Sequence, residues 1–404
     1  MGEESGCCKI AGGPGDANPL EGMSFTREAL LYVTCVYNGT GREKPDFWQR
    51  PTSIPTHPLI RKLYTGCLCR ILAMNFITPG GIHAVLAMVI PPSGHVYVID
   101  TQKSPKAPPL HKVVEPADIV EKTSLVYPHT SHCLATGDII ISFLGDKDGH
   151  SKGNRFLLLD SQFNIKGSLS GGRNRDLKLS LAMIFGRQLF VYDWSDGHLK
   201  QTLDLGDNGL IPGEIRFLHE PSKNTGYVEC VLPSNVVRFF KTQDGSWGHE
   251  AAIQVQPLKV ENWTLPEMPG LIIGLLISLD DQFLYFVNWF HGDVRQYNIE
   301  YPKNPVFVGQ VYVGGLLQNG SPIVAVAEDG TTWQADVPTI QDGKRLYVTN
   351  SLFSTWDRQF YPDVIEKGSH VLLIDVDTKK GGLKINPDFF CRFRSRTRWT
   401  LPGS

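Results

Sequence analysis

The sequence predicts an all-β protein, and a β-propeller of short antiparallel strands fits it best. The 404 residues include 40 glycines and 27 prolines, an abundance typical of many short strands separated by turns. One pattern also recurs along the chain: a turn, then a few alternating aliphatic and aromatic residues, then Asp or Asn. Such repeats are typical of propeller blades, although a β-sandwich would show similar spacing.

The repeated pattern predicts a series of strands, each of which follows a tight turn. Some are followed by a second turn and strand, as at residues 197–205. Helical signal is weak and is confined to two short segments, residues 116–123 and 358–367. The predicted strands lie within residues 93–100, 154–160, 186–193, 281–288, 342–350 and 369–375.

The segment around residue 290 combines two predicted strands with a polar turn. The strands cover residues 283–287 and 294–299, and the turn between them holds Trp289, His291, Gly292 and Asp293. Scaffolds often place functional groups on loops, and this one displays an aromatic ring, an imidazole and a carboxylate between buried strands.

Composition and charge limit the expected partners and location. The net charge is −2, so neither nucleic acid nor a membrane surface is expected as a partner. The apolar stretch at residues 265–279 contains Pro and Gly and is too short to span a bilayer. Residues 1–15 are polar and lack the apolar region of a secretory signal. The eight cysteines are scattered, so a reduced, cytoplasmic protein is expected.

Two groups of side chains are candidate ligands for soft metal ions. His129 and His132 lie three residues apart beside Cys133, and imidazole suits copper or zinc. Taken alone, such a pair is more often structural. Cys7 and Cys8 are adjacent thiols that would suit selenite-derived selenium, cadmium or zinc, although adjacent cysteines are often incidental. No phosphate-binding glycine loop, Ser-His-Asp order or zinc-finger spacing is present in the sequence.

Several long segments together resemble the selenium-binding protein family, whose members include methanethiol oxidases. The start Gly-Cys-Cys-Lys at residues 6–9 is similar to plant members. The resemblance implies a seven-bladed β-propeller over residues 26–390, with a flexible tail at residues 1–25 and another tail at 391–404. The resembling segments are residues 108–118, 128–135, 215–219, 266–299, 354–363 and 375–383.

The chain also departs from the family pattern. Members carry a stretch like D-E-L-H-H-S-G-W-N-S-C-S-S-C-H where this chain has residues 73–88. Back-translating residues 74–88 and stepping back one nucleotide restores that stretch, and residues 391–403 are a similar shift of the family sequence. Family segments between residues 167 and 188 and before residue 342 are missing. We therefore expect frame-altered segments and an incomplete propeller with unpaired strand edges.

The resemblance also implies a set of site residues. Methanethiol oxidases of the family resemble copper enzymes with histidine-rich sites, which makes His129, His132, His219 and His291 copper candidates, with Asp293 and Arg295 supporting His291. The Gly-Cys-Cys-Lys context makes Cys7 and Cys8 the selenium and soft-metal candidates. The family's His-His pair, its closing histidine and its C-S-S-C cysteines have no counterpart here.

These expectations lead to three functional hypotheses. The leading one is a protein that binds selenium and soft metals through thiols or histidines and serves sulfur and selenium handling and metal tolerance. The second is a copper-dependent oxidase that converts methanethiol, oxygen and water to formaldehyde, hydrogen sulfide and hydrogen peroxide. The third is an inactive, truncated relative. The expected partners are small thiols, selenite and soft metal ions.

Overall fold

The structure is a computed structural model of the chain. It describes residues 33–36, 47–49, 65–66, 68–70, 77–78, 81–87, 94–100, 109–133, 138–148, 150, 155–169, 186–193, 198–335, 344–351, 354–392 and 394–395. Within these ranges strands dominate and helices are few and short, so the all-β prediction is confirmed.

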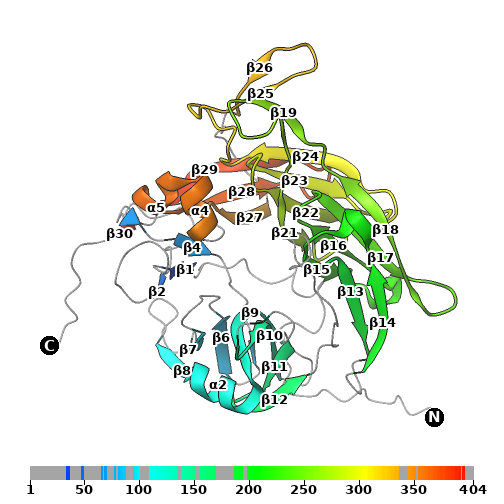
Figure 1. The fold of residues 1–404 in the computed structure, drawn as a ribbon, viewed down its shortest axis with the longest axis vertical. Helices are drawn as coiled ribbons and strands as arrows, with labels where there is room; N and C mark the ends of the chain where they lie inside the picture. The colour runs from blue at the N-terminus through cyan, green and yellow to red at the C-terminus, as the bar shows by residue number, and fades with distance from the viewer. Residues whose placement is uncertain are drawn as a thin grey trace, which may run out of the picture.

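Seven sheets of the described residues are arranged around a common centre, as the blades of a propeller are (Figure 1). The first has the order β2-β1-β4, with β1 (Val33–Val36), β2 (Phe47–Gln49) and β4 (Leu68–Arg70). The second contains β5 (Ile77–Thr78), β6 (Gly81–Ala87), β7 (Val96–Asp100) and β8 (Leu110–Val114). The third contains β9 (Leu125–Cys133), β10 (Ile139–Asp146), β11 (Arg155–Leu159) and β12 (Ile165–Leu169).

The remaining four sheets complete the arrangement around the centre. The fourth contains β13 (Gln188–Tyr192) and β14 (Leu199–Asp204). The fifth contains β15 (Pro212–Phe217), β16 (Thr225–Cys230), β17 (Asn235–Lys241) and β18 (Trp247–Gln254). The sixth contains β21 (Ile272–Ile277), β22 (Phe283–Asn288), β23 (Asp293–Asn298) and β24 (Val306–Tyr312). The seventh contains β27 (Lys344–Thr349), β28 (His370–Val376) and β29 (Leu383–Arg392).

The inner strands position the central residues. In Figure 1 the first strand of the third, fifth and sixth blades, namely β9, β15 and β21, lies nearest the centre. Each of these blades pairs its strands antiparallel and in chain order. Because four antiparallel strands return the chain to the end where the blade began, successive inner strands run in the same direction.

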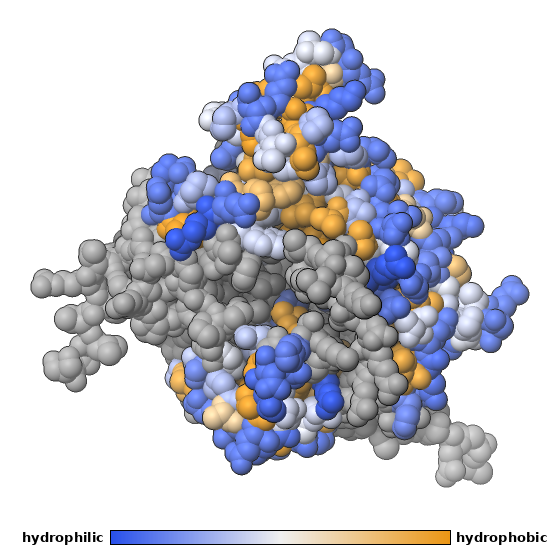
Figure 2. Space-filling model, viewed as in Figure 1, coloured by the Kyte–Doolittle hydropathy of each residue, from blue (hydrophilic) through white to orange (hydrophobic). Residues whose placement is uncertain are grey.

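A second kind of sheet projects from the ring. It has the order β20-β19-β25-β26, from β19 (Leu258–Glu261), β20 (Glu267–Met268), β25 (Val324–Val326) and β26 (Thr332–Trp333). It stands at the top of Figure 1, and Figure 2 shows apolar surface along it and at its base. There Met268, Phe290 and Leu317 belong to one buried cluster. A short parallel pair joins β3 (Thr65–Gly66) to β30 (Arg394–Ser395).

Much of the described core lies between blades, because the middle strands of the fifth and sixth sheets are buried on both faces. All six residues of β16 are buried, and five of the six residues of β22 are. Between the fifth and sixth blades, Tyr227, Ile272 and Leu284 belong to one buried cluster. Each fully buried large apolar side chain contributes about 1.5–3 kcal/mol relative to an exposed one, so neighbouring blades stabilise each other.

The fourth blade is smaller in the described residues, where it has only β13 and β14. On the neighbouring inner strand β15, Ile215 is 45% exposed and Phe217 is 56% exposed. Phe190 and Leu199 of the fourth blade are exposed as well. Apolar side chains that blades normally cover are therefore open on both sides of this junction.

The predicted elements compare well with the structure in most places. The two strands around residue 290 are β22 and β23, and the first predicted helix is α2 (Pro116–Thr123). The second predicted helix is instead two helices, α4 (Ser354–Phe360) and α5 (Pro362–Lys367). Tyr361 leaves the helical conformation, with φ −134° and ψ 61°, because a residue before proline is disfavoured in the α region.

The other short elements and the chain ends complete the description. Two 3₁₀ helices occur, η2 (Gly206–Gly209) and η3 (Pro221–Lys223). Strand β29 continues to Arg392, two residues beyond the predicted propeller boundary, because His370 pairs with Arg392. The predicted tail at residues 1–25 lies outside the described residues. Among the described residues, no helix has the length and hydrophobicity needed to cross a membrane.

We predict that Gly292→Ala destabilises the fold by about 3 kcal/mol, through strain and a backbone clash. Gly292 has φ +79°, and a Cβ there would lie 2.1 Å from the carbonyl oxygen of Gly314. Gly245, with φ +85° and nothing within 4 Å of a Cβ, is the matched control, and Gly245→Ala should cost about 1 kcal/mol. Urea unfolding measures the free energy of unfolding of both variants. Equal losses of stability in the two variants would contradict the prediction.

Candidate histidine site at one end of the ring

The inner strands β15 and β21 lie side by side and parallel. Arg216 Nε donates to the Leu275 carbonyl oxygen at 3.4 Å, and farther along both chains the His219 N–H donates to Asp281 Oδ1 at 2.7 Å. Residue numbers therefore rise together along the two strands. The turns that follow β15 and β21 consequently lie at the same end of the ring.

His219 lies in the turn after β15, and its ring is fixed by a carboxylate of the next blade. The imidazole Nδ1 is 2.9 Å from Asp281 Oδ1, and the side chain is 29% exposed. A carboxylate can only accept a hydrogen bond, so Nδ1 carries the proton and donates it. This fixes the tautomer in which Nε2 of the neutral ring has a free lone pair.

Asp281 is the buried anchor of this turn. Its carboxylate also accepts the backbone N–H of Glu220 at 3.0 Å and the Lys223 ammonium at 3.2 Å, and its side chain is 3% exposed. Burial alone would raise the pKa of Asp281, but the hydrogen bonds from His219, Glu220 and Lys223 outweigh burial and hold that pKa below its usual value. Asp281 is therefore ionised at neutral pH and holds His219 in place.

The His219–Asp281 arrangement suits two chemical roles, metal binding and proton transfer. A histidine that donates one ring N–H to a carboxylate presents its other nitrogen in a fixed direction, as metal-binding histidines commonly do. The same geometry suits a base that accepts a proton at Nε2. The His219–Asp281 pair is thus the best-formed candidate for function among the described residues.

His129 and His132 lie on another inner strand, β9. His129 is half-buried, and the described structure gives the backbone position of His132, one residue before the strand ends. Because inner strands run in the same direction, His132 lies towards the same end of the ring as His219. The structure thus places these sequence candidates on two inner strands at one end, with the fourth blade between them in the chain.

His291 lies at the other end of the sixth blade. It follows β22, whose last residue Asn288 pairs with Ile272 at the start of β21. The six-residue strand β21 separates this end from Asp281, a span of about 20 Å. One metal ion therefore cannot bind both His219 and His291, so the sequence interpretation that joined them in one central site is not supported by this geometry.

The His291 ring is fully buried, and its partner is a backbone group. Nε2 lies 2.9 Å from the Met268 carbonyl oxygen, to which it must donate. Burial lowers the pKa of His291, so the ring stays neutral below its usual titration range. Its environment is that of a core residue that ties the turn to the strand β20.

Asp293 and Arg295 form a buried network of their own. Asp293 accepts Arg295 Nε at 2.7 Å, Gln310 Nε2 at 2.6 Å and Asn288 Nδ2 at 3.0 Å. These three hydrogen bonds join strands β22, β23 and β24, whereas the His291 ring bonds the Met268 carbonyl oxygen instead. They therefore stabilise the blade, and their expected support of His291 is not seen as a hydrogen bond.

The thiol candidates Cys7 and Cys8 lie outside the described residues. Two other cysteines are described in detail, Cys230 and Cys391. Burial raises the pKa of each of these thiols to about 12, so both are protonated at neutral pH. Neither is suited to bind a soft metal or selenium as a thiolate.

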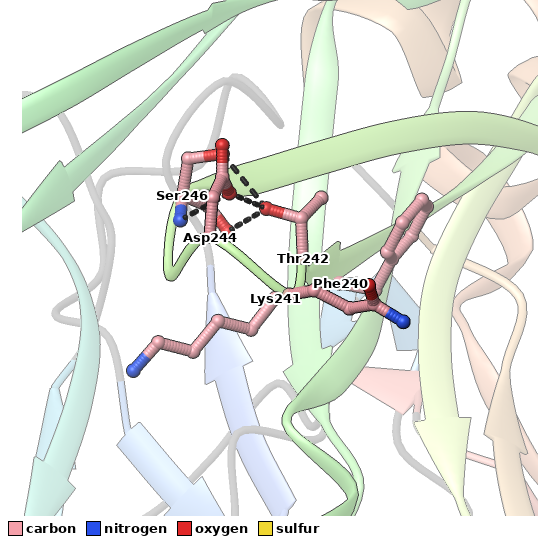
Figure 3. A pocket seen from close by; sticks show the side chains of 6 residues that line it. Phe240, Lys241, Thr242, Asp244 and Ser246 are labelled. Atoms are coloured by element: carbon pink, nitrogen blue, oxygen red, sulfur yellow. Dashed lines mark hydrogen bonds between the residues drawn. The ribbon is translucent and has the colours of Figure 1, made fainter.

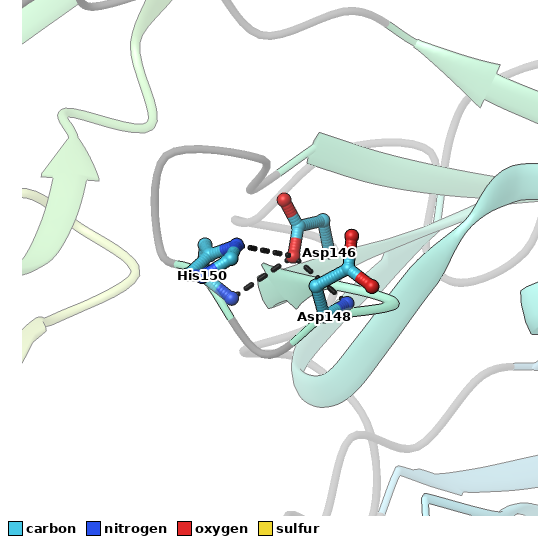
Figure 4. Close-up of side chains that lie close together, drawn as sticks. All are labelled: Asp146, Asp148 and His150. Carbon is cyan, nitrogen blue, oxygen red and sulfur yellow. Dashed lines mark hydrogen bonds and ion pairs between the residues drawn. The ribbon is translucent and has the colours of Figure 1, made fainter.

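Two surface features of the described residues are less suited to chemistry. Asp146, Asp148 and His150 place ligand atoms within 4.8 Å of one another (Figure 4), but Asp146 Oδ1 is occupied by the N–H groups of Asp148 and His150. The hollow in Figure 3 lies on an exposed turn, where Thr242, Asp244 and Ser246 bond to one another. In both turns the polar side chains form hydrogen bonds within the turn itself.

Comparisons with known proteins identify the family. A family described as "56kDa selenium binding protein (SBP56)" matches residues 83–179 and 173–400. The two matches meet where the sequence predicts a missing insertion, and the first begins inside the segment predicted to be frame-altered. The chain belongs to this selenium-binding family.

Named relatives agree with this assignment. The chain is 51% identical to "Selenium-binding protein 2" of Arabidopsis thaliana over 450 positions, covering 97% of this chain and 92% of the relative. It is 41% identical to "Methanethiol oxidase" of Xenopus laevis over 444 positions, covering 94% and 93%. Both alignments exceed the 404 residues present, so some residues of these relatives have no counterpart here.

A solved structure confirms the fold. The chain matches the X-ray structure of a hypothetical selenium-binding protein from Sulfolobus tokodaii with a TM-score of 0.76 and 27% identity, covering 94% of each chain. Together with the seven sheets described above, this match confirms the propeller that the sequence resemblance implied.

Sequence reasoning missed the residue that organises the site. Asp280 and Asp281 have the pattern of a turn before a strand, and Asp281 does bond backbone N–H groups. Those groups belong to another blade, 62 and 61 residues away in the chain. The local sequence offers one signal for Asp281. Asp280 already bonds Ser278 within the turn, so the second aspartate is not required by the turn itself.

We predict that Asp281→Asn destabilises the protein at pH 7 by about 1–3 kcal/mol, because several donors lose a buried carboxylate. A lowered pKa means that this contribution is present above the usual carboxyl pKa and is lost as pH falls below it. In urea unfolding, wild type and variant should therefore converge towards pH 3. The side chain of Asp207 is 96% exposed, and the control Asp207→Asn should change stability by less than about 0.5 kcal/mol. A pH-independent gap between Asp281→Asn and wild type would refute the assignment.

Proposed function

We propose that this member of the selenium-binding family binds a soft metal ion, with copper as the leading candidate, at the ring end where His129, His132 and His219 lie. The observation that carries the proposal is the His219–Asp281 pair, whose free Nε2 is oriented by a buried carboxylate. Imidazole nitrogen suits copper, and a carboxylate behind the ring raises its basicity.

The residues present fit such an ion in part. His219 has the tautomer that a ligand requires, and the strand directions bring His132 towards the same end. His291 does not fit the same site, because it is buried at the opposite end with Nε2 bonded to Met268. Copper, when bound, would supply one-electron chemistry for the oxidation of a small thiol by oxygen.

The name of the frog relative supports the oxidase as the second candidate function. The relative is named methanethiol oxidase, and this chain covers 93% of its length. We propose small thiols, or their selenium analogues, as the substrates of that activity. In this proposal Nε2 of His219 would hold the copper ion, so its lone pair is not available to accept the proton of the thiol.

Selenium binding through Cys7 and Cys8 is a separate part of the proposal. Its support is the names of the plant relatives and the chemistry of adjacent thiols. The described thiols Cys230 and Cys391 are protonated at neutral pH, so they do not compete for this role. Some residues of the plant relative have no counterpart in this chain. Their absence favours the competing hypothesis, that this chain is an inactive member of the family.

We expect His219→Ala to weaken copper binding by the purified 404-residue chain at least tenfold, because a fixed imidazole ligand is lost. Asp281→Asn should weaken it about 10- to 100-fold, because the ring loses its orientation. His249 is an exposed histidine on the outer strand β18, and the control His249→Ala should bind copper as wild type does. Competitive titration measures the affinities. Equal affinity in all four proteins would exclude this site.

We expect Cys7→Ser combined with Cys8→Ser to abolish selenite and cadmium retention, because both proposed thiol ligands are removed. Elemental analysis after gel filtration measures the retained ion, with Cys230→Ser as a control that should retain it. Unchanged retention in the double variant would reject the thiol site.

A further inference from the structure

Glu229 is a buried acid between the fifth and sixth blades. It lies on β16 and is 3% exposed. Its carboxyl group sits directly beneath Gly213, where a Cβ would come within 2.7 Å of Oε1. Oε1 accepts the backbone N–H of Glu214 at 3.2 Å, and the backbone N–H of Gly274 on β21 also points to the carboxyl group, whereas Oε2 makes no hydrogen bond of normal geometry with the described residues.

The charged groups around Glu229 come from one neighbouring strand. Glu214 and Arg216 on β15 pair with each other, and Arg216 also donates to Leu275 on β21. Strand β21 itself reads Ile-Ile-Gly-Leu-Leu-Ile and brings no ionisable side chain. Farther out on the sheet of Glu229, Arg238 is already paired with Glu250 at 2.6 Å. Within the part of the chain that the structure describes, no cation is therefore committed to Glu229.

A buried carboxylate without a paired cation is costly, whereas the neutral acid is tolerated. Burial, and then the nearby charge of Glu214, raise the pKa of Glu229 to about 8. The group therefore keeps its proton at neutral pH in this packing. Gly213 is exposed, so a proton leaving the carboxyl has a short route to solvent.

We propose that Glu229 is a proton-binding group that links the packing of the fifth and sixth blades to pH. When it releases its proton to solvent, two carboxylates share a single guanidinium, and Arg216 divides its contacts between Glu214 and Glu229. Because Arg216 also reaches Leu275 of the next blade, its movement loosens the junction of β15 and β21. This inference concerns the scaffold and does not depend on the proposed metal site.

Infrared spectroscopy of the full chain tests the protonation directly. The wild type should show the carbonyl band of a buried protonated carboxylic acid at pH 6.5, and the band should fade as pH rises through about 8. In Glu229→Gln this band should be missing at every pH. Glu267→Gln removes an exposed glutamate and should leave the band unchanged. A wild-type spectrum without the band at pH 6.5 would overturn the proposal.

Stability against pH provides the second readout. A raised pKa means that the folded state holds a proton that the unfolded state has lost. The folded-to-unfolded ratio should therefore fall by up to about tenfold per pH unit between the usual glutamate pKa and about pH 8, and level off above it. Glu229→Gln should reduce this slope, and Glu267→Gln should keep it. An unchanged slope in Glu229→Gln would overturn the coupling to packing.

The role of Arg216 is tested by Glu214→Gln. This variant removes the repelling carboxylate and frees the guanidinium, so the infrared transition of Glu229 should move to lower pH. If the transition stayed at the wild-type pH, the exchange of Arg216 between the two acids would be wrong.

Discussion

The fifth and sixth blades of this protein depend on each other to cover their apolar faces. The strands β16 and β22 are buried almost throughout, so neither sheet could exist in water alone. The buried cluster that contains Tyr227, Ile272 and Leu284 joins the fifth blade to the sixth. The same junction also carries the His219–Asp281 pair at one end, and Glu229 with Arg216 nearer the other. The proposed metal site and the packing of the scaffold therefore depend on the same contact between blades.

Much of the fold could be predicted from the sequence because the signals are local. Alternating aliphatic and aromatic residues after tight turns are set within a few positions, and they located β22 and β23 to within a residue. The helix α2 was predicted for the same reason. The break between α4 and α5 was missed, although Pro362 is a local signal for it.

The candidate site could be predicted only in part, because its geometry is not local. His219 was recognised as a candidate, but its partner Asp281 comes from another blade. His291 has the same residue type and an equally conspicuous turn, yet it lies at the opposite end and bonds a backbone carbonyl. Residue type and spacing identify possible ligands, whereas the direction of each strand decides which of them can meet. Only the assembled ring supplies that direction.

The projecting sheet has a consequence for how the chain is organised. Its strand β19 precedes the sixth blade and pairs with β25, which follows that blade, so Glu261 lies opposite Val324. The whole of β21 to β24 is thus enclosed in a closed loop of chain. Closing a loop of this length costs conformational entropy, which the pairing of β19 with β25 and the buried cluster at its base must offset. The pairing of β19 with β25 therefore fixes where the chain enters and leaves the sixth blade, which carries Asp281, while the apolar faces of that blade still depend on its neighbours.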